Sequence, residues 1–214
     1  MQRHLVLTAA ALALAAGAST RTAAQQRPVS VIVGLGPAQG IGLGGLPGQQ
    51  GTVHGKLLPS TTPMLGIQAP TPIRGVDVRL TVQHGHPFLA LESGGGFVLR
   101  DRAYVTTVTA DAVMSLPRLA GFRPYLTAGA GVRRFGFDQA WYRRNGSAVV
   151  PRDETVPLIH AGAGVAFKLG PADLFAEVSG VSSKFRTAGM DPGGRTVANV
   201  GYTLGVRIPL GRRR

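Results

Sequence analysis

The chain has 214 residues, of which 31 are Gly and 15 are Pro, whereas charged residues make up only 15%. Interior Gly and Pro lower helix stability by about 1 and 3 kcal/mol per site, and both recur throughout the chain after its N-terminal segment, so this composition excludes a helical protein. Because 44% of the residues are hydrophobic, a disordered chain is excluded as well.

The chain is strongly basic, with a net charge of +13 that comes from 20 Arg and three Lys against ten acidic residues. The basic residues form no helical stripe, so we expect no nucleic-acid partner. Arg pairs well with phosphate groups, which makes an anionic lipid or lipopolysaccharide surface the more natural partner. The absence of Cys excludes disulfides, thiol catalysis and Cys-bound zinc.

Residues 1–24 have the pattern of a secretory signal peptide. A polar, basic start is followed by an apolar run from Leu5 to Ala18, and small residues place cleavage after Ala18 or Ala24. This run is shorter than the roughly 20 residues of a membrane-spanning helix, although a retained N-terminal anchor is an alternative. We expect residues 25–214 to form one domain that is exported.

The exported part shows alternation of apolar and polar residues, which indicates strands. In the clearest early example, Val76, Val78, Leu80 and Val82 alternate with polar residues. The alternation predicts strands near 28–36, 74–84, 88–99, 103–116, 123–137, 156–169, 173–186 and 197–210.

The connections between these predicted strands are alternately short and long. Short turns are expected at 84–87, 117–124 and 170–172, and long loops at 37–73, 138–155 and 187–196. The segment 37–73 is rich in Gly and Pro and is expected to be a long loop. An even number of strands with short turns at one end and long loops at the other is typical of an outer-membrane barrel.

Alternation alone does not distinguish a membrane barrel from a soluble β-sandwich or a lipocalin-like barrel. Two features favour the membrane barrel: the apolar faces carry no charge at their centres, and the polar faces are rich in Gly, which suits a narrow bore. These inward Gly residues are Gly129, Gly131, Gly162, Gly164, Gly201 and Gly205. We therefore predict an all-β fold, an eight-stranded antiparallel up-and-down transmembrane β-barrel.

The polar faces also carry equal numbers of opposite charges. They are Asp77, Glu92, Asp111 and Glu177 against Arg79, Arg133, Lys168 and Arg207. Inside an eight-stranded barrel such charges would pair and fill the bore, which predicts a charge network and argues against an open channel. A set of unrelated surface charges is the alternative.

The chain resembles the small OmpA/OmpX-type outer-membrane β-barrel family over about residues 74–210. The resemblance lies in segments 124–132, 160–165 and 174–178 and in the closing strand, where Thr203, Gly205, Ile208 and Leu210 look like the C-terminal signal for insertion. It implies a monomeric scaffold in the outer membrane of a Gram-negative-type bacterium, inserted by the barrel-assembly machinery. The terminal Arg212–Arg214 in place of an aromatic residue, Pro209 in the last strand and the length of 37–73 depart from the family pattern.

The sequence contains three candidate chemical motifs. Gly40–Gly45 matches a phosphate-binding loop, but Pro47 follows where a helix should begin. His84 and His86 lack a third metal ligand, so we predict no metal site and no cofactor. His160 could act with Ser182 or Ser183 in a lipid A-modifying acyl hydrolase, because barrel enzymes of that kind use a His, a Ser and a carboxylate. The alternative is a His160 that is hydrogen-bonded within the lumen and faces away from lipid.

We expect a structural or interaction role without catalysis. The barrel would support envelope integrity and bind lipopolysaccharide or another surface partner through loop residues such as Trp141, Tyr142, Arg143 and Arg144. A narrow passive pore for small solutes and the acyl hydrolase are the alternatives.

Overall fold

The computed structural model describes residues 28–38, 40–48, 51–93, 96–137, 153–185 and 195–211, which contain eleven strands. The strands are β1 (Ser30–Ala38), β2 (Ile41–Gly48), β3 (Gly51–Leu57), β4 (Ser60–Pro70), β5 (Val76–Gly85), β6 (Phe88–Ser93), β7 (Gly96–Ser115), β8 (Phe122–Phe137), β9 (Glu154–Leu169), β10 (Ala172–Phe185) and β11 (Arg195–Pro209). Within these ranges, no helix has the length and apolar character needed to cross a membrane.

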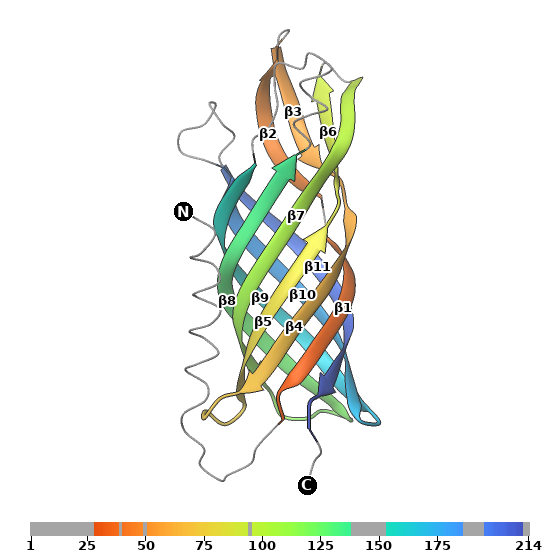
Figure 1. Cartoon of the computed structure of the whole chain (residues 1–214), viewed down its shortest axis with the longest axis vertical. Coiled ribbons are helices and arrows are strands. Elements are labelled where there is room, and N and C mark those ends of the chain that lie inside the picture. Colours follow the sequence, from red (N-terminus) through yellow and green to blue (C-terminus); the bar gives the residue numbers. More distant parts are fainter. Residues whose placement is uncertain are drawn as a thin grey trace.

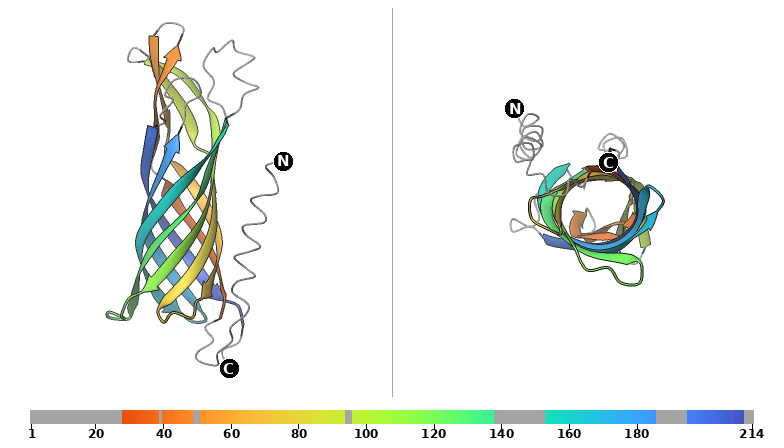
Figure 2. Two further views of the ribbon diagram at one scale, coloured as in Figure 1. Left: turned by 90° about the vertical axis from the view of Figure 1, so that its left-hand side faces the viewer. Right: turned by 90° about the horizontal axis from the view of Figure 1, so that it is seen from below.

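Eight of the strands close into a barrel (Figures 1 and 2). The order around the ring is β1, β4, β5, β7, β8, β9, β10 and β11, and β11 pairs with β1 to close it. All neighbouring pairs are antiparallel. Closure leaves none of the eight strands with a free edge along the barrel wall. The predicted eight-stranded antiparallel up-and-down barrel is confirmed.

The two ends of the barrel differ. Tight turns at 71–75, 116–121 and 170–171 lie at one end, which we call the turn end, together with the pair Ser30 and Pro209 that starts β1 and finishes β11. The opposite end, the loop end, carries a second sheet that rises above the rim in Figure 1. This extension sheet consists of β2, β3, β6 and the first part of β7, paired in that order.

A buried apolar cluster connects the extension sheet to the barrel. It contains Ile41, Leu43, Leu57, Leu89, Leu91, Ala103, Phe135, Phe137, Val156 and Val197. Residues from both sheets therefore share one core at the loop end, and the extension is packed on the barrel as a continuation of it.

The segment 37–73 is not the long loop that was expected. It contains the hairpin of β2 and β3 and a complete barrel strand, β4. Pro63, Gly66 and Pro70 interrupt the alternation in β4 and hid it in the sequence. Pro63 is tolerated because pairing with β5 starts only at the next residue, so one side of the strand needs no N–H there.

The predicted strands 88–99 and 103–116 also have different bounds in the structure. β7 runs from Gly96 to Ser115 without a turn near residue 100, and β6 pairs with the first part of β7 in the extension sheet, outside the barrel. The expected short turn at 84–87 accordingly lies at the loop end, between β5 and β6. The strand count stayed at eight because one barrel strand was missed and one strand was wrongly placed in the ring.

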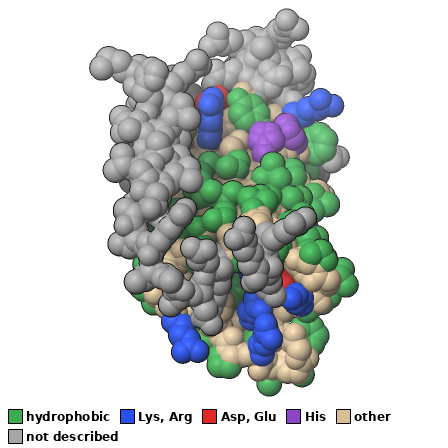
Figure 3. Space-filling view, turned by 60° about the horizontal axis from the view of Figure 1, so that its bottom comes forward, with side chains coloured by type: hydrophobic (Ala, Val, Ile, Leu, Met, Phe, Trp, Pro, Cys, Tyr) green, Lys and Arg blue, Asp and Glu red, His purple; other side chains and the backbone are tan. Residues whose placement is uncertain are grey.

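The outer surface of the barrel is apolar around its middle. Large exposed hydrophobic side chains include Val33, Leu35, Leu65, Val78, Val82, Leu126, Val132, Ile159, Val165, Val178, Val200, Leu204 and Ile208. On the face drawn in Figure 3, hydrophobic side chains cover the middle, and Lys and Arg side chains lie below and above them. Near the turn end, Phe122 and Phe167 pair across β8 and β9 with their rings in edge contact, as aromatic residues do at a membrane interface.

Candidate functional site

The bore is crossed by an ion pair at mid-height. Arg79 on β5 donates from Nη1 to Glu177 Oε2 at 2.6 Å and from Nη2 to Oε1 at 3.0 Å. Since β5 and β10 lie four places apart in a ring of eight, this bidentate pair spans the full width of the bore. Arg79 is only 1% exposed, so the contact is shielded from water.

A second set of contacts runs from Arg79 to the neighbouring strand β7 and on to β9. Arg79 Nη2 lies 3.5 Å from Asp111 Oδ2, and Asp111 Oδ1 lies 2.9 Å from His160 Nδ1. Thr109 donates its hydroxyl to Asp111 Oδ2 at 3.0 Å. We call Arg79, Asp111, His160 and Glu177 the bore cluster; its members come from four different strands and hold one another across the lumen.

A glycine makes the contact between Asp111 and His160 possible. Gly129 pairs with Asp111 on one side and with His160 on the other. A Cβ added at Gly129 would clash with Asp111 Oδ1 and with the Ala110 carbonyl. The missing side chain is thus the space that the carboxylate uses to reach the imidazole.

Other inward glycines make room for aromatic rings. Tyr125 lies over Gly164, and Phe175 lies over Gly205, each directly across the strand pair. The Gly-rich polar faces therefore serve a packed interior, in which large side chains fill the gaps that the glycines leave.

The eight charged residues expected in one network occupy separate places. Arg79, Asp111 and Glu177 are joined in the bore cluster, whereas Asp77 accepts a hydrogen bond from Gln68 at 2.7 Å and Arg207 lies over the Tyr125 ring at 5.8 Å, both nearer the turn end. Arg133 lies nearer the loop end.

Glu92 and Lys168 do not lie in the bore. Glu92 pairs with Lys56 at 2.6 Å in the extension sheet, and Lys168 is an exposed residue at the mouth of the turn end. Counting positive and negative residues on the polar faces does not distinguish a residue inside the bore from one beyond its rim, because both kinds of residue alternate with apolar neighbours in the sequence.

The neutral partners were not predicted. Thr109, Gln68 and Asn199 all bond to bore charges and were not singled out. The inward positions of Thr109 and Asn199 follow from the alternation, whereas Gln68 lies on β4, which the alternation did not predict. His160 was weighed as a catalytic base against a histidine hydrogen-bonded within the lumen, but its partner Asp111 was not predicted. With the register of β8 and β9 known, the position of His160 opposite Gly129 would have indicated that its ring faces an open space in the bore.

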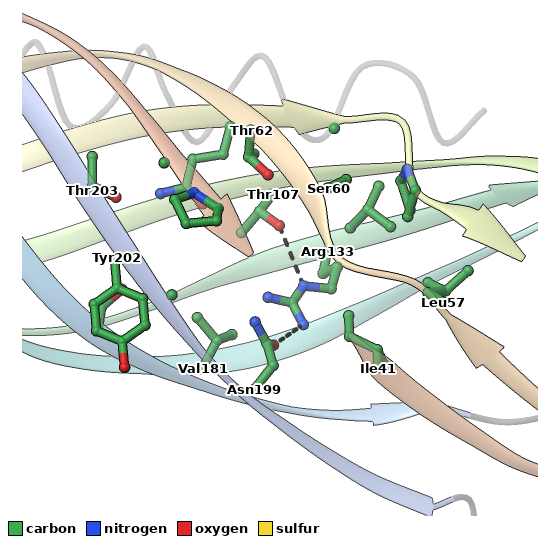
Figure 4. A pocket seen from close by; sticks show the side chains of 18 of the residues that line it. Ile41, Leu57, Ser60, Thr62, Thr107, Arg133, Val181, Asn199, Tyr202 and Thr203 are labelled. Carbon is green, nitrogen blue, oxygen red and sulfur yellow. Dashed lines mark hydrogen bonds between the residues drawn. The ribbon is translucent and has the colours of Figure 1, made fainter. Parts of the chain in front are cut away.

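Two cavities remain inside the bore, on either side of the bore cluster. The cavity at the turn end has about 90 Å³ and is lined by residues such as Asp77, Lys168 and Arg207. The cavity nearer the loop end has about 60 Å³, and Figure 4 shows Arg133 in it between Thr107 and Asn199. The cluster separates them, because Arg79 lies on β5 between Asp77 of one lining and Gln83 of the other, and Glu177 lies on β10 between Asp173 and Ser179.

The arrangement around His160 does not form a catalytic triad in the described part of the chain. His160 is buried in the bore and pairs with Val181, while Ser182 and Ser183 pair with Ile159 and Leu158. None of the described hydrogen bonds joins His160 to a serine; its partner is Asp111. A lipid acyl chain would approach from the outer wall, on the far side of the strand.

His84 and His86 lie at the loop end of β5. Their Nε2 atoms are 3.1 Å apart, and His84 Nδ1 lies 2.8 Å from Thr106 Oγ1. Within the described ranges, no group of three His, Cys, Asp or Glu residues could hold a metal ion. Residues 41–45 of the glycine motif belong to β2, and β3 follows them as the next element, so the strand–turn–helix context of a phosphate loop is missing there.

The proposed insertion signal lies on β11 and just after it. Thr203 faces the bore, Gly205 lies under the Phe175 ring, and Ile208 and Leu210 are exposed on the outer surface. The loop residues Trp141, Tyr142, Arg143 and Arg144 and the segment 1–24 lie outside the described residues.

No protein-family model and no curated protein sequence matches the chain. Solved structures do match. Neisserial surface protein A superposes with a TM-score of 0.57 at 13% sequence identity, over 85% of this chain and 97% of that one. The outer membrane protein OprG from Pseudomonas aeruginosa superposes with a TM-score of 0.56 at 11% identity, over 88% and 98%. At these identities the likeness is one of fold, and together with the closed ring and its apolar outer band it gives the conclusion that the protein has the fold of the small eight-stranded outer-membrane β-barrels.

Proposed function

We propose that the protein is a non-conducting scaffold of the outer membrane, exported with residues 1–24 as its signal peptide and inserted as a monomer by the barrel-assembly machinery. The observation that supports this role best is the bore cluster, because a buried bidentate ion pair spans the full width of the bore, and an eight-stranded barrel is just wide enough for side chains to fill. A barrel without a path through it would act as a structural part of the membrane and as a support for the loops at its ends.

Planar-bilayer conductance tests this role. We expect the wild-type protein to give no steady current steps, whereas the double variant Arg79→Ala with Glu177→Ala, which removes both charges together, should give measurable ones. The matched control removes the ion pair Lys56–Glu92 in the extension sheet by the same two kinds of substitution and should stay silent. Steady steps from the wild-type protein would contradict the proposal and favour the passive pore.

Lipopolysaccharide is the surface partner that the composition favours, since an excess of Arg suits phosphate groups. We expect Arg143→Gln with Arg144→Gln to weaken lipopolysaccharide binding several-fold in a vesicle flotation or surface-binding assay. The control is Arg74→Gln with Arg118→Gln, two exposed residues at the turn end. Equal binding by both double variants would remove these loop residues from the proposal.

The acyl hydrolase is the weaker reading, because His160 faces the bore and bonds to Asp111. Acyl release from lipid A that disappears in His160→Ala would nevertheless favour the enzyme over the scaffold.

A further inference from the structure

The cavity nearer the loop end contains a buried cation that has no acidic partner among the described residues. Arg133 on β8 faces the bore and is 4% exposed. Its Nε donates to Thr107 Oγ1 at 3.3 Å, its Nη1 donates to Asn199 Oδ1 at 2.7 Å, and its guanidinium lies over the Phe135 ring at 5.9 Å. All three contacts are to uncharged groups, and no described acidic residue forms an ion pair with Arg133.

The hydrogen bonds of Arg133 are incomplete as well. A guanidinium carries five N–H donors, and the described contacts use two of them. Burying an ion costs several kcal/mol unless a counter-charge and hydrogen bonds compensate it. The bore cluster shows how this chain meets that cost for Arg79, with two carboxylates; at Arg133 the compensating charge is missing from the described side chains.

The space beside Arg133 sets the size of what could supply that charge. The cavity of about 60 Å³ corresponds to roughly four water-sized positions. Thr107 and Asn199 line it on the polar side, and Ile41, Leu57 and Val181 are apolar residues of its lining (Figure 4). Because the Asn199 carbonyl accepts from Arg133, its NH2 group remains available as a donor.

We propose that this cavity binds a small monocarboxylate of about the size of acetate or propionate. Its carboxylate would accept from the remaining N–H groups of Arg133, and its short alkyl part would lie against Val181 and the apolar lining. A single negative charge balances the single cation, whereas a phosphate dianion would bury a second, unpaired charge. The site lies on the loop side of the bore cluster, so it needs no passage through the barrel and does not depend on the scaffold role.

The test is a titration of the refolded full-length barrel in detergent micelles with ¹³C-labelled acetate and with propionate, followed by NMR in a buffer without other small anions. We expect saturable binding of one acetate per chain, at least tenfold weaker binding of hexanoate and phosphate, and at least a tenfold loss of acetate affinity in Arg133→Gln. The matched control is Arg134→Gln, the next residue on β8, whose side chain is 59% exposed and pairs with Asp153; its acetate affinity should equal that of the wild type.

A second variant separates loss of the site from loss of the fold. Val181→Phe keeps Arg133 and fills the cavity, so it should abolish acetate binding while the barrel keeps its folded mobility on a gel without boiling. The proposal would be overturned by the absence of saturable acetate binding to the wild type, by unchanged affinity in Arg133→Gln, or by chloride that displaces acetate at equal concentration, since the last result would identify a halide site.

Discussion

At the scale of single residues, the inward glycines decide how the bore is packed. Gly129 is the clearest case, because Asp111 reaches His160 across the position where any other residue would have a Cβ. The sequence predicts that Gly on polar faces suits a narrow bore, and this contact is the physical reason.

Gly129→Ala is predicted to lower the free energy of unfolding by about 1–3 kcal/mol, since the added methyl group must displace a carboxylate and a backbone carbonyl. Urea unfolding of the barrel in lipid vesicles measures this. The control is Gly180→Ala on β10, where the nearest atom to an added Cβ is 3.9 Å away and the change should stay within about 0.5 kcal/mol. Equal effects at both positions would show that the bore is looser than described.

The partners of the charges could not be predicted at this scale. The sequence places Arg79 and Glu177 on inward faces, but their contact across the bore depends on the registers of the strands between them, each of which shifts the height of a side chain. Alternation specifies the face of a strand and not the height of a residue along the barrel. It therefore placed Arg79 and Glu177 on inward faces without showing that they meet, and it wrongly placed Glu92 and Lys168 in the bore.

At the scale of the strands, the outward faces carry the argument for a membrane. Leu65, the sixth of eleven residues in β4, is 61% exposed and lies between strands that also present apolar side chains outward. Leu65→Arg is predicted to cost about 2–4 kcal/mol in lipid, because Arg would then face the hydrocarbon.

The matched control for Leu65→Arg is Leu119→Arg, in the tight turn after β7, where the side chain is 71% exposed and lies near the water. Its effect on the same unfolding measurement should be small. If Leu65→Arg were as mild as Leu119→Arg, the outer face of β4 would be solvated and the barrel would not be embedded there.

The strands also show where alternation fails as a predictor. The predicted ranges agree closely with the regular strands β5, β8, β9, β10 and β11. One face of each strand lines the bore and the other is apolar and faces outward, so polar and apolar residues alternate along it. β4 was missed because Pro63 and Gly66 break its pattern, and its place is set by pairing with β1 and β5, which local sequence does not report.

At the scale of the whole molecule, the protein is a packed barrel with an apolar outer band. Its ring of strands is closed, and the bore cluster fills its interior at mid-height. The comparison with Neisserial surface protein A and OprG supports the same fold over nearly the full length of those proteins. Nothing in the fold alone selects a partner, which is why the loop end and the Arg133 cavity carry the functional proposals.

The central claim, that this chain is a membrane barrel and not a soluble β-protein, is tested most directly by gel mobility with and without boiling after refolding into detergent or lipid. We predict that the chain folds only when detergent or lipid is present, and that the unboiled sample then migrates as a compact species that boiling converts to the unfolded one. A chain that folds in plain buffer, with no change of mobility on boiling in detergent, would contradict the account.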